Sequence, residues 1–405
     1  MRGGFTAALL LCAAAAAAQD APPSADSVPP ANPAPPPFEV VHDWTTADAA
    51  GIAADFEART SLRWVDGEAE DMVLVSRIIG GDPPGAAIMP LGRQASDLAR
   101  GGFLTDLTAL AESQRWRDHM ADPALLDACT IEGRVYCVPV TLRAGGWLAL
   151  WRPAFVRSGQ PAPETWSELV ESEKRLRASG ITPLSAPGTA ELGELLAGLT
   201  LDAGGYGEWM AAHRDGNDAA VAGPAFTQGF EAFALARQLA HGSDRGLPDI
   251  AGVPGGKPAA TLTSRGSWRE ASDEDHKCLA GLGLTGPLVL AGDGAFFPNL
   301  RDPKLEAAQK TLAAMLFEPE AQTALGNALG VLPARGSLNL TGLHACARRG
   351  LVALATRGSV PERDRLVSPG VGDVLDALLS EFWTDPDLTP ADLQARYAEV
   401  IARGR

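Results

Sequence analysis

Tryptophan is the residue type in this chain whose number and placement suggest a binding chemistry. The sequence has nine tryptophans and only three tyrosines. A pyranose ring has an apolar C–H face that stacks on an aromatic ring, and its hydroxyls need fixed polar partners. Trp44, Trp147 and Trp268 lie at or near the ends of expected strands or in loops. They are candidates for stacking on a sugar, with core packing as the alternative, above all for Trp147.

Residues that could carry catalysis do not form a recognisable pattern. The sequence contains no GxSxG, HExxH or GxxxxGK[ST] motif, and no GxGxxG between an expected strand and helix. A glycosidase needs two carboxylates facing each other across a cleft, and only Asp43, Asp48 and Asp293 are candidates. The sequence therefore predicts a protein that is not an enzyme, with no catalytic residue, metal site or cofactor.

The first 37 residues are interpreted as an export signal (residues 1–18) and a tether (19–37). Arg2 is followed by an apolar run and by Ala16-Ala17-Ala18, which fits a cleavage site. The run is too short to span a bilayer, so we expect a periplasmic protein. Residues 19–37 are rich in proline and alanine, as flexible tethers are. A lipid anchor at Cys12 is the alternative, disfavoured because bulky Leu11 precedes it.

Length and charge limit the remaining classes of protein. A chain of 405 residues with 46% hydrophobic residues can bury a large core and suggests two domains or one bilobed unit. The formal net charge of −16 argues against nucleic-acid binding and against docking on anionic lipid. It is otherwise typical of a soluble protein.

Four cysteines follow the signal segment, namely Cys129, Cys137, Cys278 and Cys346. An exported compartment permits disulfides, and four cysteines allow three pairings. Cys129 and Cys137 flank Glu132-Gly133-Arg134, a plausible hairpin turn, which favours this pair and leaves Cys278 with Cys346. Four buried free thiols are the alternative. The absence of CxxC and HxxxH spacing argues against a zinc site.

Hydrophobic periodicity predicts the elements that position these residues. Strands are expected at 38–42, 62–65 and 86–89, with helices at 48–59 and 72–79 between them. This alternation is typical of a parallel α/β sheet. Further strands are expected at 136–140 and 147–151. A helix is expected to begin at Thr165-Trp166, with Thr165 as N-cap and Glu168 completing a capping box. Later helices are expected at 226–241, 305–317, 320–329 and 371–403, the last with a break at Asp385-Pro386.

Eight short motifs carry a resemblance to a known family. In chain order they are His42-Asp43-Trp44-Thr45-Thr46, Gly81-Asp82-Pro83-Pro84 before Ala86-Ala87, Val138-Pro139-Val140 leading to Trp147-Leu148, Pro163-Glu164-Thr165-Trp166, Gly266-Ser267-Trp268, Asp293-Gly294, Gly330 to Arg335, and Leu340-Thr341-Gly342-Leu343 with Cys346. No single motif is specific. Eight in this order resemble the extracellular solute-binding proteins of ABC sugar importers, in particular the glucose/mannose-binding branch.

The resemblance implies a type II periplasmic-binding-protein-like fold, with two α/β lobes joined by crossover strands. Lobe 1 would hold residues 38–141 and 292–335, and lobe 2 would hold 142–291 and 336–405. A small polar solute, a sugar or sugar derivative, would bind in the interlobe cleft of a monomer, and an ABC permease in the inner membrane would recognise the closed form. The implied ligand-binding residues are Asp43, Trp44, Thr45, Asp48, Arg143, Trp147, Trp268 and Asp293.

Several positions depart from the branch. Asp43 replaces a tryptophan, Ile88 a glutamine, Arg143 a histidine and Ser267 an aspartate, and an expected histidine is missing near residues 368–370. Because buried hydroxyl sites reject ligands that leave their polar groups unpaired, the glucose assignment does not carry over. Arg143 would suit a carboxylate or phosphate, so an acidic sugar is one hypothesis for the ligand.

The sequence therefore predicts a receptor for sugar transport. Two other functions remain open. One is a binding module that presents its ligand to a membrane sensor, and the other is a secreted carbohydrate-active enzyme.

Overall fold

Strands and helices alternate at the start of the described chain, which in the computed structural model comprises residues 35–68, 70–241, 257–263 and 274–404. The order is β1 (Pro37–Val41), α1 (Thr46–Thr60), β2 (Arg63–Gly67), α2 (Asp71–Gly80) and β3 (Ala86–Pro90). β1 pairs in parallel with both β2 and β3. This is the parallel arrangement that the hydrophobic pattern predicts.

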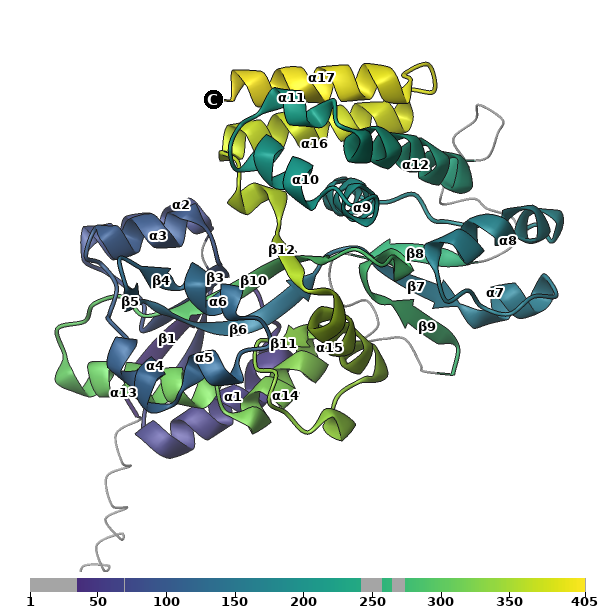
Figure 1. The fold of residues 1–405 in the computed structure, drawn as a ribbon. Coiled ribbons are helices and arrows are strands. Elements are labelled where there is room, and N and C mark those ends of the chain that lie inside the picture. The colour runs from purple at the N-terminus through teal and green to yellow at the C-terminus, as the bar shows by residue number, and fades with distance from the viewer. Residues whose placement is uncertain (1–34, 69, 242–256, 264–273, 405) are drawn as a thin grey trace, which may run out of the picture. The chain divides into compact units, whose positions relative to one another are not determined.

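The main sheet has seven strands and is only partly parallel. Its order is β11-β6-β10-β3-β1-β2, and β12 also pairs with β10. The later strands are β6 (Cys137–Ala144), β10 (Leu288–Phe296), β11 (Leu332–Pro333) and β12 (Ser359–Pro361). β10 runs antiparallel to β3 and β6, so strands from distant parts of the sequence make the sheet mixed. The long strands β6 and β10 lie side by side (Figure 1).

A second sheet has three antiparallel strands in the order β8-β7-β9. They are β7 (Trp147–Trp151), β8 (Ala260–Thr263) and β9 (His276–Leu279). A separate group of helices packs together (Figure 1). In it α9 (Thr189–Asp202) and α17 (Pro390–Arg403) each contact both α12 (Pro224–His241) and α16 (Pro369–Thr384). The predicted break near residue 385 is the turn between α16 and α17.

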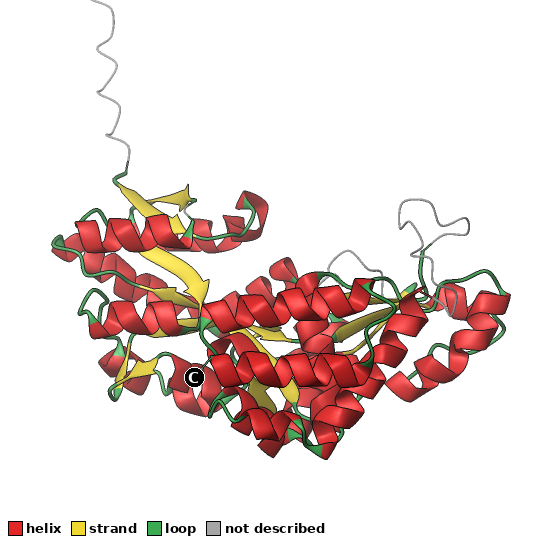
Figure 2. Cartoon of the chain, turned by 90° about the horizontal axis from the view of Figure 1, so that it is seen from above, coloured by secondary structure: helices red, strands yellow, loops and turns green. Residues whose placement is uncertain are grey.

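Helices make up more of the described chain than strands do (Figure 2). The remaining helices and short strands are α3 (Arg93–Arg100), α4 (Thr108–Ser113), α5 (Trp116–His119), α6 (Pro123–Ala128), β4 (Thr130–Ile131), β5 (Arg134–Val135), α7 (Arg152–Arg157), α8 (Trp166–Ala178), α10 (Tyr206–His213), α11 (Asp218–Val221), η2 (Ala280–Gly283), α13 (Pro303–Leu316), α14 (Pro319–Leu329), η3 (Leu340–Gly342), α15 (Ala345–Arg357) and η4 (Arg363–Arg365).

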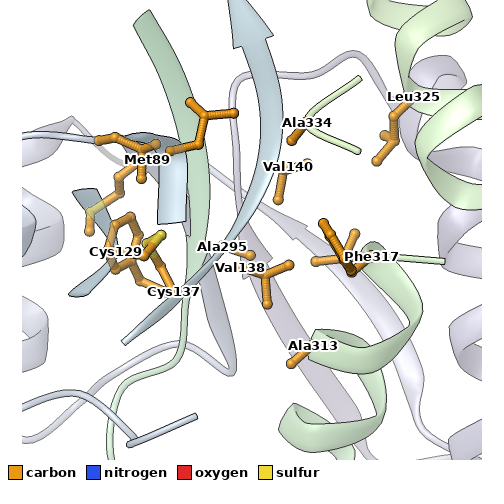
Figure 3. Close-up of a cluster of buried hydrophobic side chains, with 14 of the residues drawn as sticks. Met89, Cys129, Cys137, Val138, Val140, Ala295, Ala313, Phe317, Leu325 and Ala334 are labelled. Carbon is orange, nitrogen blue, oxygen red and sulfur yellow. A yellow bond between two sulfur atoms is a disulfide. The ribbon is translucent and has the colours of Figure 1, made fainter. Parts of the chain in front are cut away.

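Buried apolar side chains form two clusters. The first surrounds the main sheet and includes Phe56, Val138 and Phe317, and Figure 3 shows part of it, with Val138 and Phe317 labelled. The second lies among the helices of the group formed by α9, α12, α16 and α17 and against the three-stranded sheet, and it includes Phe226 and Tyr397. Burial of large apolar side chains is the main force that stabilises such cores, at roughly 1.5–3 kcal/mol for each side chain.

Strand β10 contributes to both clusters because its side chains alternate. Leu288 and Leu290 belong to the first cluster, whereas Val289 between them belongs to the second. Successive side chains of a strand point to opposite faces. The two cores therefore meet at β10, next to its partner strand β6.

Two disulfides join the pairs that the sequence favours. Cys129 and Cys137 are bonded on either side of the β4–β5 hairpin. Its two turn residues, Glu132 and Gly133, have φ of 52° and 80°, as a type I′ turn requires. Cys278 of β9 is bonded to Cys346 of α15, which connects the three-stranded sheet to a helix of the first cluster.

The start of α8 differs in one detail from the predicted capping box. The Thr165 hydroxyl accepts a hydrogen bond from the Glu168 N–H (3.2 Å), as predicted. The Glu168 carboxylate, however, accepts from the N–H of Glu164 (2.7 Å) instead of from the N–H of the cap residue. The extended backbone at Thr165 brings the preceding N–H within reach of this side chain. Among the described residues, no helix is long and apolar enough to cross a membrane.

Candidate ligand-binding cavity

A cavity of about 360 Å³ lies beside strands β6 and β10, and Ala197, Trp209 and Val289 of the second cluster are in its wall. Its wall combines the ends of β3 and β6, the start of β10, the segment from β12 into η4, and helices α9, α10 and α16. The lining residues are Pro90, Arg143, Ala190, Gly193, Glu194, Ala197, Trp209, Val289, Ala291, Glu362, Arg363, Asp364 and Asp376. Two guanidinium groups and four carboxyl groups are among them, so the cavity is polar and rich in charge.

Arg143 on β6 is held by Asp293 of the neighbouring strand. Its Nη2 lies 3.4 Å from Asp293 Oδ1, and the two side chains are 18% and 22% exposed. Thr141 Oγ1 donates to the other carboxylate oxygen of Asp293 (2.6 Å). Thr141 is the partner of Asp293 in the β6–β10 register, so the carboxylate sits diagonally from Arg143 across the strand pair. The charge of Arg143 is therefore already matched within the protein.

Glu194 of α9 brings a carboxyl group to the cavity wall. The N–H of Gly146 donates to its Oε2 (2.9 Å). Burial raises the pKa of Glu194 to about 7, and the nearby charges of Glu191 and Glu362 act in the same direction, against Gly146 and Arg143. Because a buried carboxylate loses its hydration, this group holds its proton up to about pH 7, whereas a solvated glutamate is ionised above about 4.5.

Glu362 follows β12 and is the second carboxyl group of this kind. Burial raises its pKa to about 7, and Asp364 and Asp293 add to the rise while Arg143 and Arg365 oppose it. In the part of the chain that the structure describes, neither Glu362 nor Glu194 makes a direct ion pair with a cationic side chain. Both groups can therefore accept a cation or a hydrogen-bond donor from a ligand.

Arg363 is the second guanidinium group of the wall and is 9% exposed. Its Nη2 contacts Asp364 Oδ1 (2.9 Å) and Asp376 Oδ1 (2.7 Å). Burial lowers the pKa of Arg363, but Tyr397, Asp364 and Asp376 outweigh this effect and raise it. The Nη1 atom has no hydrogen-bond acceptor among the described residues. A Cβ atom on Gly193 would lie 3.4 Å from this Nη1, so glycine leaves room there.

Trp209 of α10 is backed by a buried polar chain. The ring of His213 lies 4.0 Å from that of Trp209, centroid to centroid. His213 Nδ1 lies 2.9 Å from the Trp209 carbonyl oxygen and Nε2 lies 2.7 Å from the Tyr397 hydroxyl. Since a carbonyl only accepts, Nδ1 carries the hydrogen and Nε2 accepts from Tyr397. Burial lowers the pKa of His213 to about 3, so the ring is neutral and holds Trp209 in place.

Trp209 also presents an unsatisfied donor in the cavity wall. The residue is 1% exposed, and its indole N–H has no acceptor among the described residues. Buried polar groups are normally hydrogen-bonded.

The candidates at the end of β1 lie outside the cavity lining. Asp43 and Thr45 are exposed, and Thr45 Oγ1 caps α1 by accepting from the N–H of Asp48 (3.2 Å). Trp44 is 9% exposed and stacks on His42, with ring centroids 5.1 Å apart. A ligand role for Asp43, Trp44, Thr45 and Asp48 stays a prediction.

The other candidates divide into three groups. Arg143 lines the cavity, and Asp293 holds it there. Trp147 is 2% exposed and packs in the first cluster, where a Cβ on Gly350 would come within 2.8 Å of its ring. Trp147 thus has the packing role that the sequence leaves open, and it is not among the lining residues. Trp268 lies outside the described residues.

Sequence reasoning missed Glu194, Trp209, Glu362 and Arg363. The sequence does mark Glu194, because it is the one charged residue in the leucine-rich run 192–201 of α9, most of whose residues are buried. The run 362–365 alternates acid and base and reads as a solvated loop. Its burial depends on β12 pairing with β10, which no local pattern reveals. Over the described residues, no cluster of three or more potential metal-ligating side chains occurs.

The sequence of this chain matches a known protein family and a curated relative. Residues 73–343 match the family model described as bacterial extracellular solute-binding protein. A curated relative from Rhizobium meliloti (strain 1021), named "Probable sugar-binding periplasmic protein", is 25% identical over 337 residues, which cover 78% of this chain and 80% of the relative.

Solved structures show the same fold. A chitin oligosaccharide binding protein has a TM-score of 0.67 at 17% identity, with 91% of this chain and 99% of that chain covered. Maltose-bound MalE3 of T. maritima has a TM-score of 0.66 at 17% identity, with 90% and 98% covered. The predicted bilobed α/β fold is therefore confirmed.

Proposed function

The chain belongs to the bacterial extracellular solute-binding proteins, and from this premise we propose that it captures a sugar or sugar derivative for an ABC import system. The observation that carries the proposal is the charged cavity beside strands β6 and β10. Its volume of about 360 Å³ is within the range of sites for small ligands. Its carboxyl and guanidinium groups are the fixed polar partners that sugar hydroxyls need. The name of the Rhizobium meliloti relative supports the same class of ligand.

We propose that the ligand bridges two lobes, residues 38–141 with 292–335 and residues 142–291 with 336–405. Pro90 would belong to the first, and Arg143, Glu194 and Glu362 to the second. A ligand shifts an open–closed equilibrium only by as much as it binds the closed state more tightly. Contacts from the end of β1, where Asp43 and Trp44 lie, would supply that difference on closure. A membrane permease would then take the solute from the closed form.

We propose further that the protein binds its solute without turning it over and acts as a monomer. Family membership supports binding as the activity. Export would depend on residues 1–18 as a signal peptide, with residues 19–37 as the tether of the mature chain.

A thermal-shift screen of the mature chain tests the proposal. The panel would contain neutral hexoses, disaccharides, hexosamines, uronic acids, sugar phosphates and, as non-sugar controls, amino acids and short peptides. A ligand at a concentration 100 times its Kd adds about 2.7 kcal/mol to the stability of the folded state. We expect at least one sugar to raise the melting temperature. A cooperative melt that shifts only with amino acids or peptides contradicts the sugar assignment.

A further inference from the structure

The cavity carries more acidic than basic groups, and its basic groups are already paired. Arg143 faces Asp293, and Arg363 contacts both Asp364 and Asp376. Four carboxyl groups and two guanidinium groups line the cavity, and Asp293 adds a further carboxylate beside Arg143. An anionic ligand would therefore compete with these carboxylates for both cations, although Arg143 Nε and Arg363 Nη1 have no acceptor among the described residues. The hypothesis that Arg143 selects an acidic sugar stays a prediction, and the excess of carboxyl groups in the wall favours a cationic ligand instead.

Two of the carboxyl groups, Glu194 and Glu362, are left without an ion-pair partner in the described chain. They come from different elements, α9 and the segment after β12, and both line the cavity, where the charge of Arg143 acts to lower the pKa of each. Burying a carboxylate without a partner is costly. A cation supplied by the ligand would compensate this cost, whereas a neutral ligand would leave one or both groups protonated.

The same wall also holds donors that lack an acceptor. The Trp209 indole N–H and Arg363 Nη1 are both unpaired among the described residues, and their side chains are 1% and 9% exposed. A hydroxyl oxygen that reached either donor would satisfy it. The wall is thus matched by a molecule that has hydroxyl oxygens as well as a positive charge.

We propose that the cavity selects a sugar that carries a basic amine, with the ammonium group facing Glu194 and Glu362. This inference rests on the proposed function and names the ligand class for the same site. Hydrogen bonds to ionised groups are stronger than those between neutral groups, and we expect each carboxylate engaged to raise the affinity roughly tenfold or more. An amino sugar is therefore expected to bind more tightly than its neutral parent.

The preference is expected to depend on pH. The charge of Glu362 raises the pKa of Glu194, and the N–H of Gly146 donates to Glu194. The other charged groups that affect the ionisation of the two glutamates are Glu191 of α9, Arg143 of β6, Asp293 of β10, and Asp364 and Arg365 of η4. Burial raises the pKa of both glutamates to about 7, so at pH 5.0 both hold protons that an ammonium group must displace. The advantage of the amino sugar is expected to be large at pH 7.0 and smaller at pH 5.0.

Calorimetric titration of the mature chain tests the inference. The probes are glucosamine, galactosamine and the fully deacetylated chitosan disaccharide, with glucose, galactose and cellobiose as neutral parents and glucuronate and galacturonate as anionic analogues. We expect at least one amine to bind tenfold or more tightly than its parent at pH 7.0. E194Q and E362Q should each weaken amine binding about tenfold and change neutral-sugar binding less. E399Q, at an exposed site on α17 (63% exposed), serves as the matched control.

The outcomes separate the inference from the proposed function. A neutral sugar that binds as tightly as its amine, or a uronate that binds most tightly, overturns the inference and leaves the sugar receptor intact. Equal effects of E194Q and E399Q on amine affinity overturn the placement of the ammonium group. Absence of binding by every sugar of the panel overturns both.

Discussion

Replacing Glu194 by glutamine should stabilise the ligand-free protein at alkaline pH and leave its stability nearly unchanged in acid. The neutral amide has almost the shape of the protonated carboxyl group and can still accept from the Gly146 N–H, as Oε2 does now at 2.9 Å. The substitution therefore removes the ionisation of the group and little else.

The magnitude follows from the pKa of Glu194, which burial raises from 4.5 to about 7. One pKa unit corresponds to 1.36 kcal/mol, so ionising this group in the folded state costs about 3 kcal/mol. The folded state holds the proton more tightly than the unfolded state does. The contribution of this group to the free energy of unfolding is fully present below pH 4.5. It falls as the pH rises towards 7 and is lost above that pH. E194Q is not subject to this loss.

Melting temperatures of the wild type and E194Q, measured without ligand between pH 4.5 and 8.5, test this reasoning. We expect similar values at pH 4.5 and a rise of roughly 6–12 °C for E194Q at pH 8.5, since about 1 kcal/mol changes the melting temperature of large domains by roughly 2–4 °C. E399Q should follow the wild type, because exposed ion pairs contribute little. An E194Q protein that is less stable than the wild type at pH 8.5 would refute the idea that ionising the buried Glu194 carboxylate destabilises the fold.

Two further predictions concern packing and one concerns ligand binding. Replacing Cys278 and Cys346 together by serine should cost about 4 kcal/mol, because their disulfide closes a loop with a sequence separation of 68 residues; urea unfolding would show no loss of this size if the bond contributed nothing. Gly350→Ala should cost about 1–3 kcal/mol by overpacking against the ring of Trp147, and a melting temperature equal to that of the wild type would contradict this contact. Trp44→Ala should weaken binding of the cognate sugar at least tenfold if it stacks on the ligand after closure, and unchanged affinity in a calorimetric titration would remove it from the site.

The order of elements in the first 90 residues could be predicted because the local pattern is strong. Strands there alternate with helices whose apolar residues recur on one face, as Ile52 and Phe56 do in α1. The hairpin between Cys129 and Cys137 and the break near residue 385 were predictable for the same reason, since turn residues mark both. Antiparallel β10 was not predicted, because its pairing with β3 and β6 joins segments far apart in the sequence.

The candidate site could be predicted only in part. Arg143 was found because it replaces a histidine of a recognisable motif, and it does line the cavity. Glu194 and Glu362 were missed because their importance lies in burial, which depends on how α9, β10 and β12 pack. Tryptophan count alone could not separate stacking from core packing. Trp147 proves to lie in the core, whereas Trp209, which the sequence analysis did not consider, lines the cavity.

The most direct test of the account is a crystal structure of the mature chain with the sugar that gives the largest thermal shift. We predict that the sugar occupies the cavity and contacts Arg143, Glu194 and Glu362. A sugar bound elsewhere on the protein, with these three side chains untouched, would contradict the assignment of the cavity as the solute site.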